Sequence, residues 1–325
     1  MSARAVALGR ASLRPAIALR EHGVLVVLVV LIVVFSAQSD AFLTTDNLRV
    51  IAQSAALPAL IACGVTVGIL AGQFDLSVGG TYGFASVMTA VVGSHAGVVA
   101  GVAAGIATGL GIGAINGLLV ARVGIQSFLV TLATGFIAVG LGLVLTDGSG
   151  SWIIDDYDAF VPIAQGTFAT VQWRVWLVLA IFLAAALLLA RTRPGRQVYA
   201  VGGSLVAARI AGVRTRLVIF SVFLVTGACA GLAGVIGAAD AGVAQASGGV
   251  GMEFAAITAV IVGGTSILGG RGSVWRTLVG VLLLAVISNG FTLLYIDPIY
   301  NSLVQGVIIL AAITFEARLR RVSPS

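Results

Sequence analysis

The stretch AGQFDLSVGG, residues 71–80, places one carboxylate, Asp75, between two long apolar segments. A carboxylate inside a bilayer costs about 2.5–3.5 kcal/mol on insertion scales, so such a group usually faces a cavity, a partner or a substrate path. Gln73, Ser77 and the glycines around them could support a discontinuous helix beside a binding site. Alternatively, Asp75 caps the following helix by accepting hydrogen bonds from its free N–H groups. The two interpretations are compatible, and the sequence leaves both open.

Other polar side chains also interrupt the apolar segments. They are Asn116, Thr131, Gln245, Thr265, Ser266, Asn289 and Gln305. Within lipid, such groups usually hydrogen-bond between helices, and we expect that role for each of them ahead of ligand binding. All but Gln305 also join Gln73, Asp75 and Ser77 in a candidate substrate path.

The residue patterns of known catalytic sites are absent. The chain has two histidines, His22 and His95, with no paired-histidine metal motif and no Gly-x-Ser-x-Gly turn. Ser266 in GTSI resembles an intramembrane protease nucleophile, but no histidine follows it to act as a base. All 18 basic residues are arginine, which excludes a Walker P-loop because that motif needs a lysine. We therefore expect no catalytic residue and no metal ligand, and a membrane enzyme is the least favoured class.

The composition indicates the fold class. Hydrophobic residues make up 59% of the chain and charged residues 9%, and the mean hydropathy is +1.12. A soluble domain has about 25% charged residues. Because a helical span needs roughly 20 apolar residues, we predict about ten spans, near 24–41, 50–70, 77–96, 98–121, 126–146, 173–190, 217–239, 252–269, 275–296 and 299–316. The sequence thus predicts an all-α polytopic membrane protein.

The arginines predict the orientation, because positively charged loops stay in the cytoplasm. With both termini inside, only Arg49 and Arg174 fall outside, whereas most acidic residues collect there. The arginine-rich start, followed by an apolar run, could also be a signal peptide, but without a small-residue cleavage site we expect an uncleaved first span. The predicted parts are a cytoplasmic tail at 1–22, a membrane domain at 23–316 with an external loop at 147–172 and a cytoplasmic loop at 191–216, and a cytoplasmic tail at 317–325.

Two internal regularities accompany the spans. Glycine recurs at every fourth residue from Gly97 to Gly117, which lets a neighbouring backbone approach closely. We expect this ladder to pack inside the chain, and a dimerisation seam is the alternative. Spans two to five start outside and spans seven to ten start inside, which is the parity of an inverted repeat. Glycines and polar residues interrupt the second, third and eighth spans, where broken or re-entrant helices are expected.

The loop 191–216 contains six arginines and no acid. Ser204 is a predicted N-cap and Gly212 a predicted C-terminal stop, and together they bracket a helix of about two turns. A capped helix in a loop suits the presentation of a surface to a partner. A basic loop that fixes topology and contacts anionic lipid is the alternative. Residue physics leaves these two interpretations open.

Four segments together resemble a known family. AGQFDLSVGG, INGLLVARVGIQSFLVTLATGFIAVGLGLVLTDG, GRQVYAVGGSLVAARIAGVRTR and FAAITAVIVGGTSILGGRGSVWRTLVGVLLLAVISNG resemble, in this order, the permease subunits of ribose-type ABC sugar importers. These permeases belong to the branched-chain amino acid/ribose permease superfamily, and the resemblance runs from about residue 45 to the C-terminus. The element Asp-Leu-Ser-Val-Gly at 75–79 favours the sugar branch over the amino-acid branch.

The resemblance implies partners and roles. It implies a bacterial cell-membrane permease that forms a dimer with an identical or similar chain. This dimer would work with cytoplasmic ATPase subunits, which use ATP and magnesium, and with an extracytoplasmic sugar-binding protein. It implies no cofactor in this chain and no nucleic acid. The segment resembling 203–213 is the coupling helix that docks on the ATPase, which makes Gly203, Ser204, Ala207, Ala208, Arg209 and Gly212 the candidate coupling residues.

The sequence departs from the family pattern at three positions. Gln73 stands where the family usually has glycine, Phe74 where it has an aliphatic residue, and Val206 where it often has an acid. The first two flank the candidate substrate path, so the transported sugar is not carried over from the family. A nucleoside or another small polar solute is an alternative cargo. A secondary transporter or channel that works alone is the alternative class.

Overall fold

The computed structural model describes residues 23–297, 299–300, 303–304, 306–308, 310–311 and 314. After a first helix at Gly23–Gln38, the elements are α2 (Thr45–Leu70), α3 (Val78–Ala96), α4 (Val98–Leu118), the π-helix η1 (Leu119–Val123), α5 (Ser127–Leu145), β1 (Ser151–Ile153), α6 (Tyr157–Gln165), β2 (Thr167–Phe168), β3 (Val171–Gln172), α7 (Trp173–Arg191), α8 (Arg193–Gly203), α9 (Leu205–Ile210), α10 (Thr215–Ala241), β4 (Val243–Gln245), α11 (Met252–Val262) and α12 (Val274–Leu293). The predicted tails, most of the tenth span and Gln305 lie outside the described residues.

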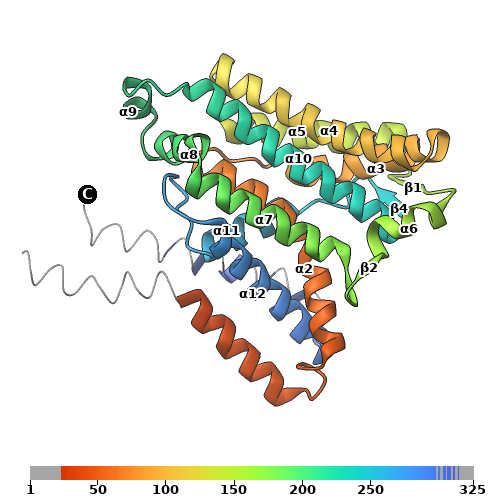
Figure 1. The fold of residues 1–325 in the computed structure, drawn as a ribbon. Coiled ribbons are helices and arrows are strands. Elements are labelled where there is room, and N and C mark those ends of the chain that lie inside the picture. The colour runs from red at the N-terminus through yellow and green to blue at the C-terminus, as the bar shows by residue number, and fades with distance from the viewer. Residues whose placement is uncertain are drawn as a thin grey trace, which may run out of the picture.

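Two long helices form the centre of the bundle. α10 packs on α4, α3 and α2, and α2 packs in turn on α12 and α11. Within their most apolar windows, 67% of the residues of α2 and of α10 are buried, against 22–39% in the other four long apolar helices. Figure 1 shows α8 and α9 at one end of the long helices and β1, β4 and α6 at the other. We call these the α9 end and the β1 end.

Six helices among the described residues are long and apolar enough to cross a membrane: α2, α4 with η1, α5, α7, α10 and α12. Each coincides with a predicted span, which confirms a helical, multi-pass membrane protein. The third predicted span is the helix α3, and the first is helical from Gly23 to Gln38.

The eighth predicted span is shorter than expected. The hydropathy pattern extends it to residue 269, but α11 ends at Val262. Gly264, Gly269, Gly270 and Gly272 have φ between +71° and +153°, a region that L side chains rarely adopt and that a right-handed helix excludes. The chain therefore continues to α12 as a non-helical loop, residues 263–273.

The helical structure breaks after each of the two central helices, α2 and α10. We call these two breaks, residues 71–77 and 242–251, the interruptions. α2, with 26 residues, leads into a non-helical segment at 71–77 and then into α3. α10, with 27 residues, leads through Gly242 and β4 into α11. Gly72 and Gly242 end the respective helices with φ of +73° and +67°, so glycine is the residue that permits each exit.

The glycine ladder of α4 packs within the chain. A Cβ added to Gly101 would lie 2.9 Å from Gly93 Cα on α3, and one added to Gly109 would lie 2.7 Å from Gly231 Cα on α10. Such distances are too short for any side chain, so the ladder lets α4 contact both helices backbone to backbone. The packing interpretation is confirmed at these positions. Gly97 faces open space and caps α4 with φ +85°.

Small elements close the β1 end. β1 pairs antiparallel with β4, with Trp152 opposite Ala244, and so joins the segment after α5 to the one after α10.

Two ion pairs involve arginines near this end. Arg174 pairs with Asp240 at 2.6 Å and Arg49 with Asp46 at 2.9 Å. The two arginines that the charge count leaves on the outer side are thus both neutralised by a carboxylate.

Candidate functional site

The non-helical segment 71–77 is held in part by hydroxyl groups of α5. The N–H of Phe74 donates to Ser127 Oγ at 3.2 Å, and the N–H of Leu76 donates to Thr131 Oγ1 at 3.0 Å. Ser127 and Thr131 lie one turn apart on α5, so a pair of hydroxyls on one helix face satisfies the backbone of a chain that runs past it. An interrupted helix inside a bundle needs such partners because its free N–H groups cannot reach water.

Asp75 is 2% exposed and accepts three hydrogen bonds. Its Oδ1 accepts from the N–H of Ser77 at 2.9 Å and from Ser77 Oγ at 2.5 Å. Its Oδ2 accepts from Thr226 Oγ1 on α10, also at 2.5 Å. Neither ion pair among the described residues includes Asp75. The carboxylate is therefore stabilised by hydrogen-bond donors rather than by a cation.

The capping role predicted for Asp75 requires a correction. The N-cap residue of α3 is Ser77, whose side chain makes no capping bond within the helix. Asp75 binds the N–H of Ser77 itself, one position before the first turn of α3. Its carboxylate therefore fixes the direction in which the chain enters α3 and does not occupy the cap position.

The hydrogen bonds continue from Ser77 across two further helices. Asn116 Nδ2 on α4 donates to Ser77 Oγ at 2.9 Å, and Thr134 Oγ1 on α5 donates to Asn116 Oδ1 at 2.8 Å. We call the set Asp75, Ser77, Asn116, Thr134 and Thr226 the polar chain. It ties α10, the start of α3, α4 and α5 together near the interruption. Its members, apart from the half-buried Thr134, are at most 2% exposed.

The structure brings some of the predicted path residues together and separates others. Asp75, Ser77, Asn116 and Thr131 meet at the interruption, next to the half-buried Gln73. Asn289 instead exchanges two hydrogen bonds with Asn47, at 2.8 and 3.0 Å, and joins α12 to α2. The interhelical role expected for Asn116 and Asn289 is confirmed, whereas Thr131, within the described part of the chain, bonds to the non-helical segment 71–77 and not to another helix.

The remaining predicted residues lie elsewhere. Gln245 ends β4 with an exposed side chain, and its carbonyl accepts from Ser86 Oγ at 3.4 Å. Thr265 and Ser266 lie in the loop 263–273, where the Ser266 N–H donates to the Arg271 carbonyl at 2.8 Å. Thr265 Oγ1 is buried without a hydrogen-bond partner among the described residues.

Sequence reasoning missed three residues of this region. Thr226 and Thr134 lie in apolar runs with no local sign of their partners, and only the tertiary packing brings them to Asp75 and Asn116. Glu253, in the first turn of α11, accepts from the Gly251 N–H at 3.1 and 3.2 Å and lies against Gly79 of α3. Its signal was an acid at the edge of an apolar stretch.

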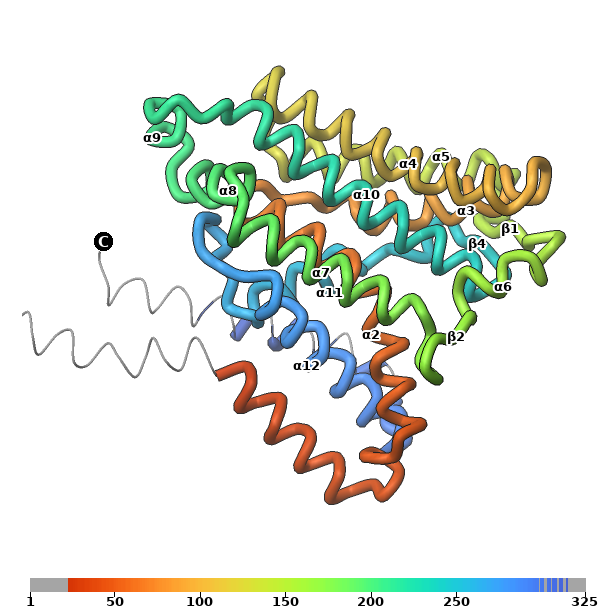
Figure 2. The backbone as a smooth tube through the Cα atoms, viewed as in Figure 1, coloured from red at the N-terminus to blue at the C-terminus, as the bar shows by residue number. Residues whose placement is uncertain are grey.

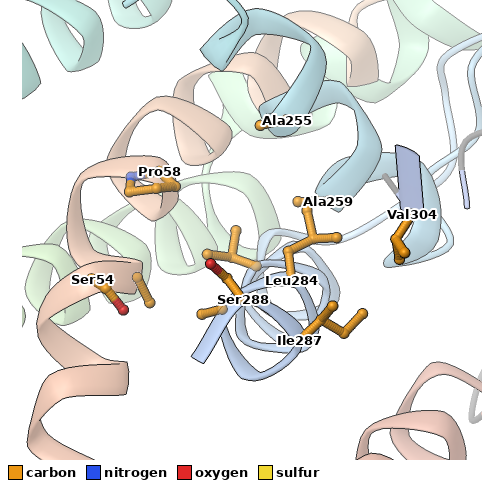
Figure 3. Close-up of a pocket in the computed structure, with 11 residues that line it drawn as sticks. Ser54, Pro58, Ala255, Ala259, Leu284, Ile287, Ser288 and Val304 are labelled. Atoms are coloured by element: carbon orange, nitrogen blue, oxygen red, sulfur yellow. The ribbon is translucent and has the colours of Figure 1, made fainter. Parts of the chain in front are cut away.

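An apolar pocket of about 240 Å³ lies between α2, α11 and α12 (Figure 3). Pro58 lies on its wall, and because proline has no N–H it cannot donate to the carbonyl of Ser54 one turn earlier. Ser54 and Ser288 supply hydroxyls, and most of the other lining residues are aliphatic or alanine. None of the predicted path residues lines this pocket.

The short helix α9 begins and ends as expected. Ser204 Oγ accepts from the Ala207 N–H at 3.2 Å, and Gly212 leaves the helix with φ +79°. Ala208 is buried against the body, whereas Val206 and Ile210, one turn apart, are 69% and 83% exposed. α9 therefore presents an apolar ridge away from the bundle, flanked by the exposed side chains of Ala207 and Arg209.

Arginines surround a hollow beside α9. A cavity of about 940 Å³ is lined by Arg122, Arg209, Arg214 and Arg216 among its polar residues, and no carboxylate of the described residues lines it. Leu118, Leu217 and Phe220 contribute apolar walls. The α9 end thus combines an exposed apolar helix with positive charge, which suits a partner with an apolar groove and acidic rim.

Long apolar helices around an interrupted, hydrogen-bonded core define a multi-pass membrane protein of the transporter type. The sequence matches the family described as branched-chain amino acid transport system / permease component over residues 47–313, and the chain belongs to this family.

The similarity to known proteins extends over nearly the whole chain. This chain is 37% identical to the ribose import permease protein RbsC of Escherichia coli (strain K12) over 298 residues, and the alignment covers 91% of this chain and 93% of RbsC. The D-allose transport system permease protein AlsC of the same organism is 34% identical over 300 residues, 91% of each chain. Its L-arabinose transport system permease protein AraH is 33% identical over 300 residues, 91% of this chain and 90% of the relative. No solved structure matches the chain. The resemblance to ribose-type permeases is confirmed.

Proposed function

We propose that this chain is the membrane-spanning subunit of a bacterial ATP-driven importer that carries a monosaccharide delivered by an extracytoplasmic binding protein. The observation that carries the ATP-driven part is α9, a capped helix that projects from one end of the bundle with Val206 and Ile210 exposed. A permease powered by a separate ATPase needs such a surface. The sugar part is supported by three relatives whose names state sugar transport and whose lengths this chain covers to 90% or more.

The proposed topology has ten spans with both termini in the cytoplasm, so that the α9 end is cytoplasmic. The pairing of Arg49 and Arg174 with acids supports this orientation, because the arginines around α9, which form no ion pair within the part of the chain that the structure describes, then face the cytoplasm. An inverted repeat is supported by the order of the elements, because a long helix, an interruption and a shorter helix follow one another twice. The first set is α2, 71–77 and α3, and the second is α10, 242–251 and α11.

In the proposed mechanism, two permease chains form a dimer, and ATP binding in the partner ATPase moves α9. The dimer then alternates between outward-open and inward-open states, because nucleotide-bound ATPase and sugar-loaded binding protein have different affinities for these states. Among the candidate coupling residues, the exposed Ala207 and Arg209 would contact the ATPase, whereas the buried Ala208 would position α9 on the body. ATP and magnesium act in the partner chain.

The proposed function is tested in proteoliposomes that contain the chain with or without its ATPase. We expect accumulation of labelled ribose, arabinose or allose only when ATPase, ATP on the α9 side and the sugar-loaded binding protein are all present. Accumulation by the chain alone, driven by an ion gradient, would overturn the proposal in favour of a secondary transporter. A nucleoside included in the same panel of solutes tests the alternative cargo.

A further inference from the structure

Three backbone segments from distant parts of the sequence meet at the α9 end. They are Gly72 just after α2, Gly202 near the end of α8, and Gly269 with Gly270 in the loop 263–273. We call these four residues the glycine junction. A Cβ added to Gly269 would lie 2.8 Å from Gly72 N and 3.1 Å from Gly202 Cα, and one added to Gly270 would lie 2.7 Å from Gly203 Cα. The three segments therefore touch without any side chain between them.

One hydrogen bond closes the junction. The N–H of Gly270 donates to the carbonyl of Leu70, the last residue of α2, at 2.9 Å. A Cβ on Gly202 would overlap that same carbonyl and would lie 2.6 Å from Gly270 N. Gly202 has no left-handed φ, so space alone, and not backbone conformation, requires glycine there.

A second contact fixes α8 to the same loop. Tyr199, one turn before Gly202, donates its hydroxyl proton to the carbonyl of Gly272 at 3.0 Å. Burial raises the pKa of Tyr199 above its ordinary value, and the opposing influence of nearby Arg276 is smaller. The phenol is therefore a neutral donor at physiological pH. α8 is thus held at two points, one backbone contact and one hydrogen bond.

The position of the junction links two regions described above. Gly202 is followed, after one residue, by Ser204, the N-cap of α9. Gly72 lies near the start of the non-helical segment 71–77, and Asp75 and Ser77 of the polar chain lie near its end. Figure 2 shows the end of α8 beside the loop between α11 and α12 at the α9 end of the molecule. The glycine junction therefore connects the start of α9 with the start of the segment 71–77 through direct backbone contacts.

We propose that the glycine junction is the positioning element that passes the movement of α9 to the interruption 71–77 and to the loop 263–273 during transport. This inference rests on the proposed docking of α9 on an ATPase. Side chains between elements can absorb a shift by changing rotamer, but packed backbones with fixed contacts cannot. Glycine at these positions keeps the contact short and stiff.

The test uses the whole importer in proteoliposomes and measures sugar imported per ATP hydrolysed, with co-purification of the ATPase as the readout of assembly. In Gly202→Ala we expect this ratio to fall by about tenfold, while the amount of bound ATPase stays within about twofold of wild type. Tyr199→Phe, which only removes the hydrogen bond to Gly272, is expected to lower the ratio by about two- to fivefold. Gly111→Ala is the matched control, because Gly111 is a helical glycine with nothing within 4 Å of an added Cβ.

The outcomes separate the junction from the proposed function. If wild type shows no ATP-driven uptake, the proposed function fails. If wild type transports and both variants keep the wild-type ratio, the junction proposal alone is overturned. A purely structural role would lower the protein level or the thermal stability of Gly202→Ala but leave the ratio of the surviving complexes unchanged, which also overturns it. If Gly202→Ala does not reach the membrane, Tyr199→Phe tests the proposal alone. A lower ratio of sugar imported per ATP supports the junction, and a wild-type ratio overturns it.

Discussion

Replacement of Asp75 distinguishes a structural carboxylate from one that binds sugar. In Asp75→Asn, one amide oxygen still accepts from the N–H and Oγ of Ser77, but the amide nitrogen cannot accept from Thr226. Thr226 Oγ1 lies 3.0 Å from the Phe223 carbonyl, so it has a second acceptor within its own helix and could accept from the new amide. The asparagine thus loses the bond from Thr226 and the charge that strengthens the two bonds from Ser77. Because no charge is buried any longer, part of this loss is offset, and we expect a net destabilisation of about 1–2 kcal/mol.

Asp75→Ala removes all three acceptor contacts. Thr226 keeps its alternative acceptor, but the buried N–H of Ser77 loses its partner, and Asn116 is left bound to a hydroxyl that is no longer oriented. A buried donor without a partner costs about 1–3 kcal/mol, and the charged hydrogen bonds lost add about 1.5–3 kcal/mol each, less the relief of burying no charge. We expect a destabilisation of about 3–5 kcal/mol for alanine.

Thermal unfolding in detergent and uptake kinetics test this reasoning together. We expect a decrease in the melting temperature for Asp75→Asn and a decrease at least about twice as large for Asp75→Ala, with the KM for sugar unchanged in Asp75→Asn. Combined with Thr226→Val, Asp75→Asn should be less than additive, because both remove the same bond. Ser221→Ala is the control, since the hydrogen bond that Ser221 Oγ makes among the described residues is to the carbonyl of Val218 on its own helix. A KM raised about tenfold with an unchanged melting temperature would refute the structural role.

Three further changes test other parts of the molecule. Arg209→Glu should abolish ATP-driven uptake, because it reverses the charge beside the exposed ridge of α9; normal uptake with normal membrane insertion would exclude docking there. Gly109→Leu should prevent accumulation of folded protein, since α4 touches α10 at this point, whereas Gly111→Leu, which faces open space, should accumulate normally on a membrane-fraction blot. Arg174→Gln should lower the melting temperature by leaving Asp240 without its cation; equal melting temperatures would assign the pair no net stabilisation.

The long helices could be predicted from the sequence because their signal is local. A run of about 20 apolar residues can satisfy its backbone in lipid only as a helix, and α2, α4 and α10 follow directly from it. The end of α11 could not be predicted in this way. On a hydropathy scale, VIVGGTSILGG is an apolar segment. Whether its glycines adopt positive φ depends instead on the neighbours that occupy the space around them, here Gly72 and Gly202.

Residues of the candidate site could be predicted only where a polar side chain in an apolar segment has a high free-energy cost in lipid. Asp75 and Asn116 stood out in the sequence because polar groups in lipid need partners. Thr226 and Thr134 did not, because a threonine in an apolar helix can bond to its own backbone and has no sequence sign of a distant partner. Gln245 and Asn289 were as polar as Asn116, yet the fold places them at β4 and at the α2–α12 contact.

The glycines of AGQFDLSVGG now have separate physical explanations. Gly72 permits the exit from α2 and belongs to the glycine junction. Gly79 lies against the carboxylate of Glu253 and the backbone of Gly249, where the second interruption ends and α11 begins, and Gly80 lies against the backbone of Gly135 on α5. The first turn of α3 therefore touches the start of α11, so the two interruptions meet at Gly79. Close contacts at Gly72 and at Gly79 therefore lie on either side of Asp75, and the movement proposed for the glycine junction would reach Glu253 through Gly79.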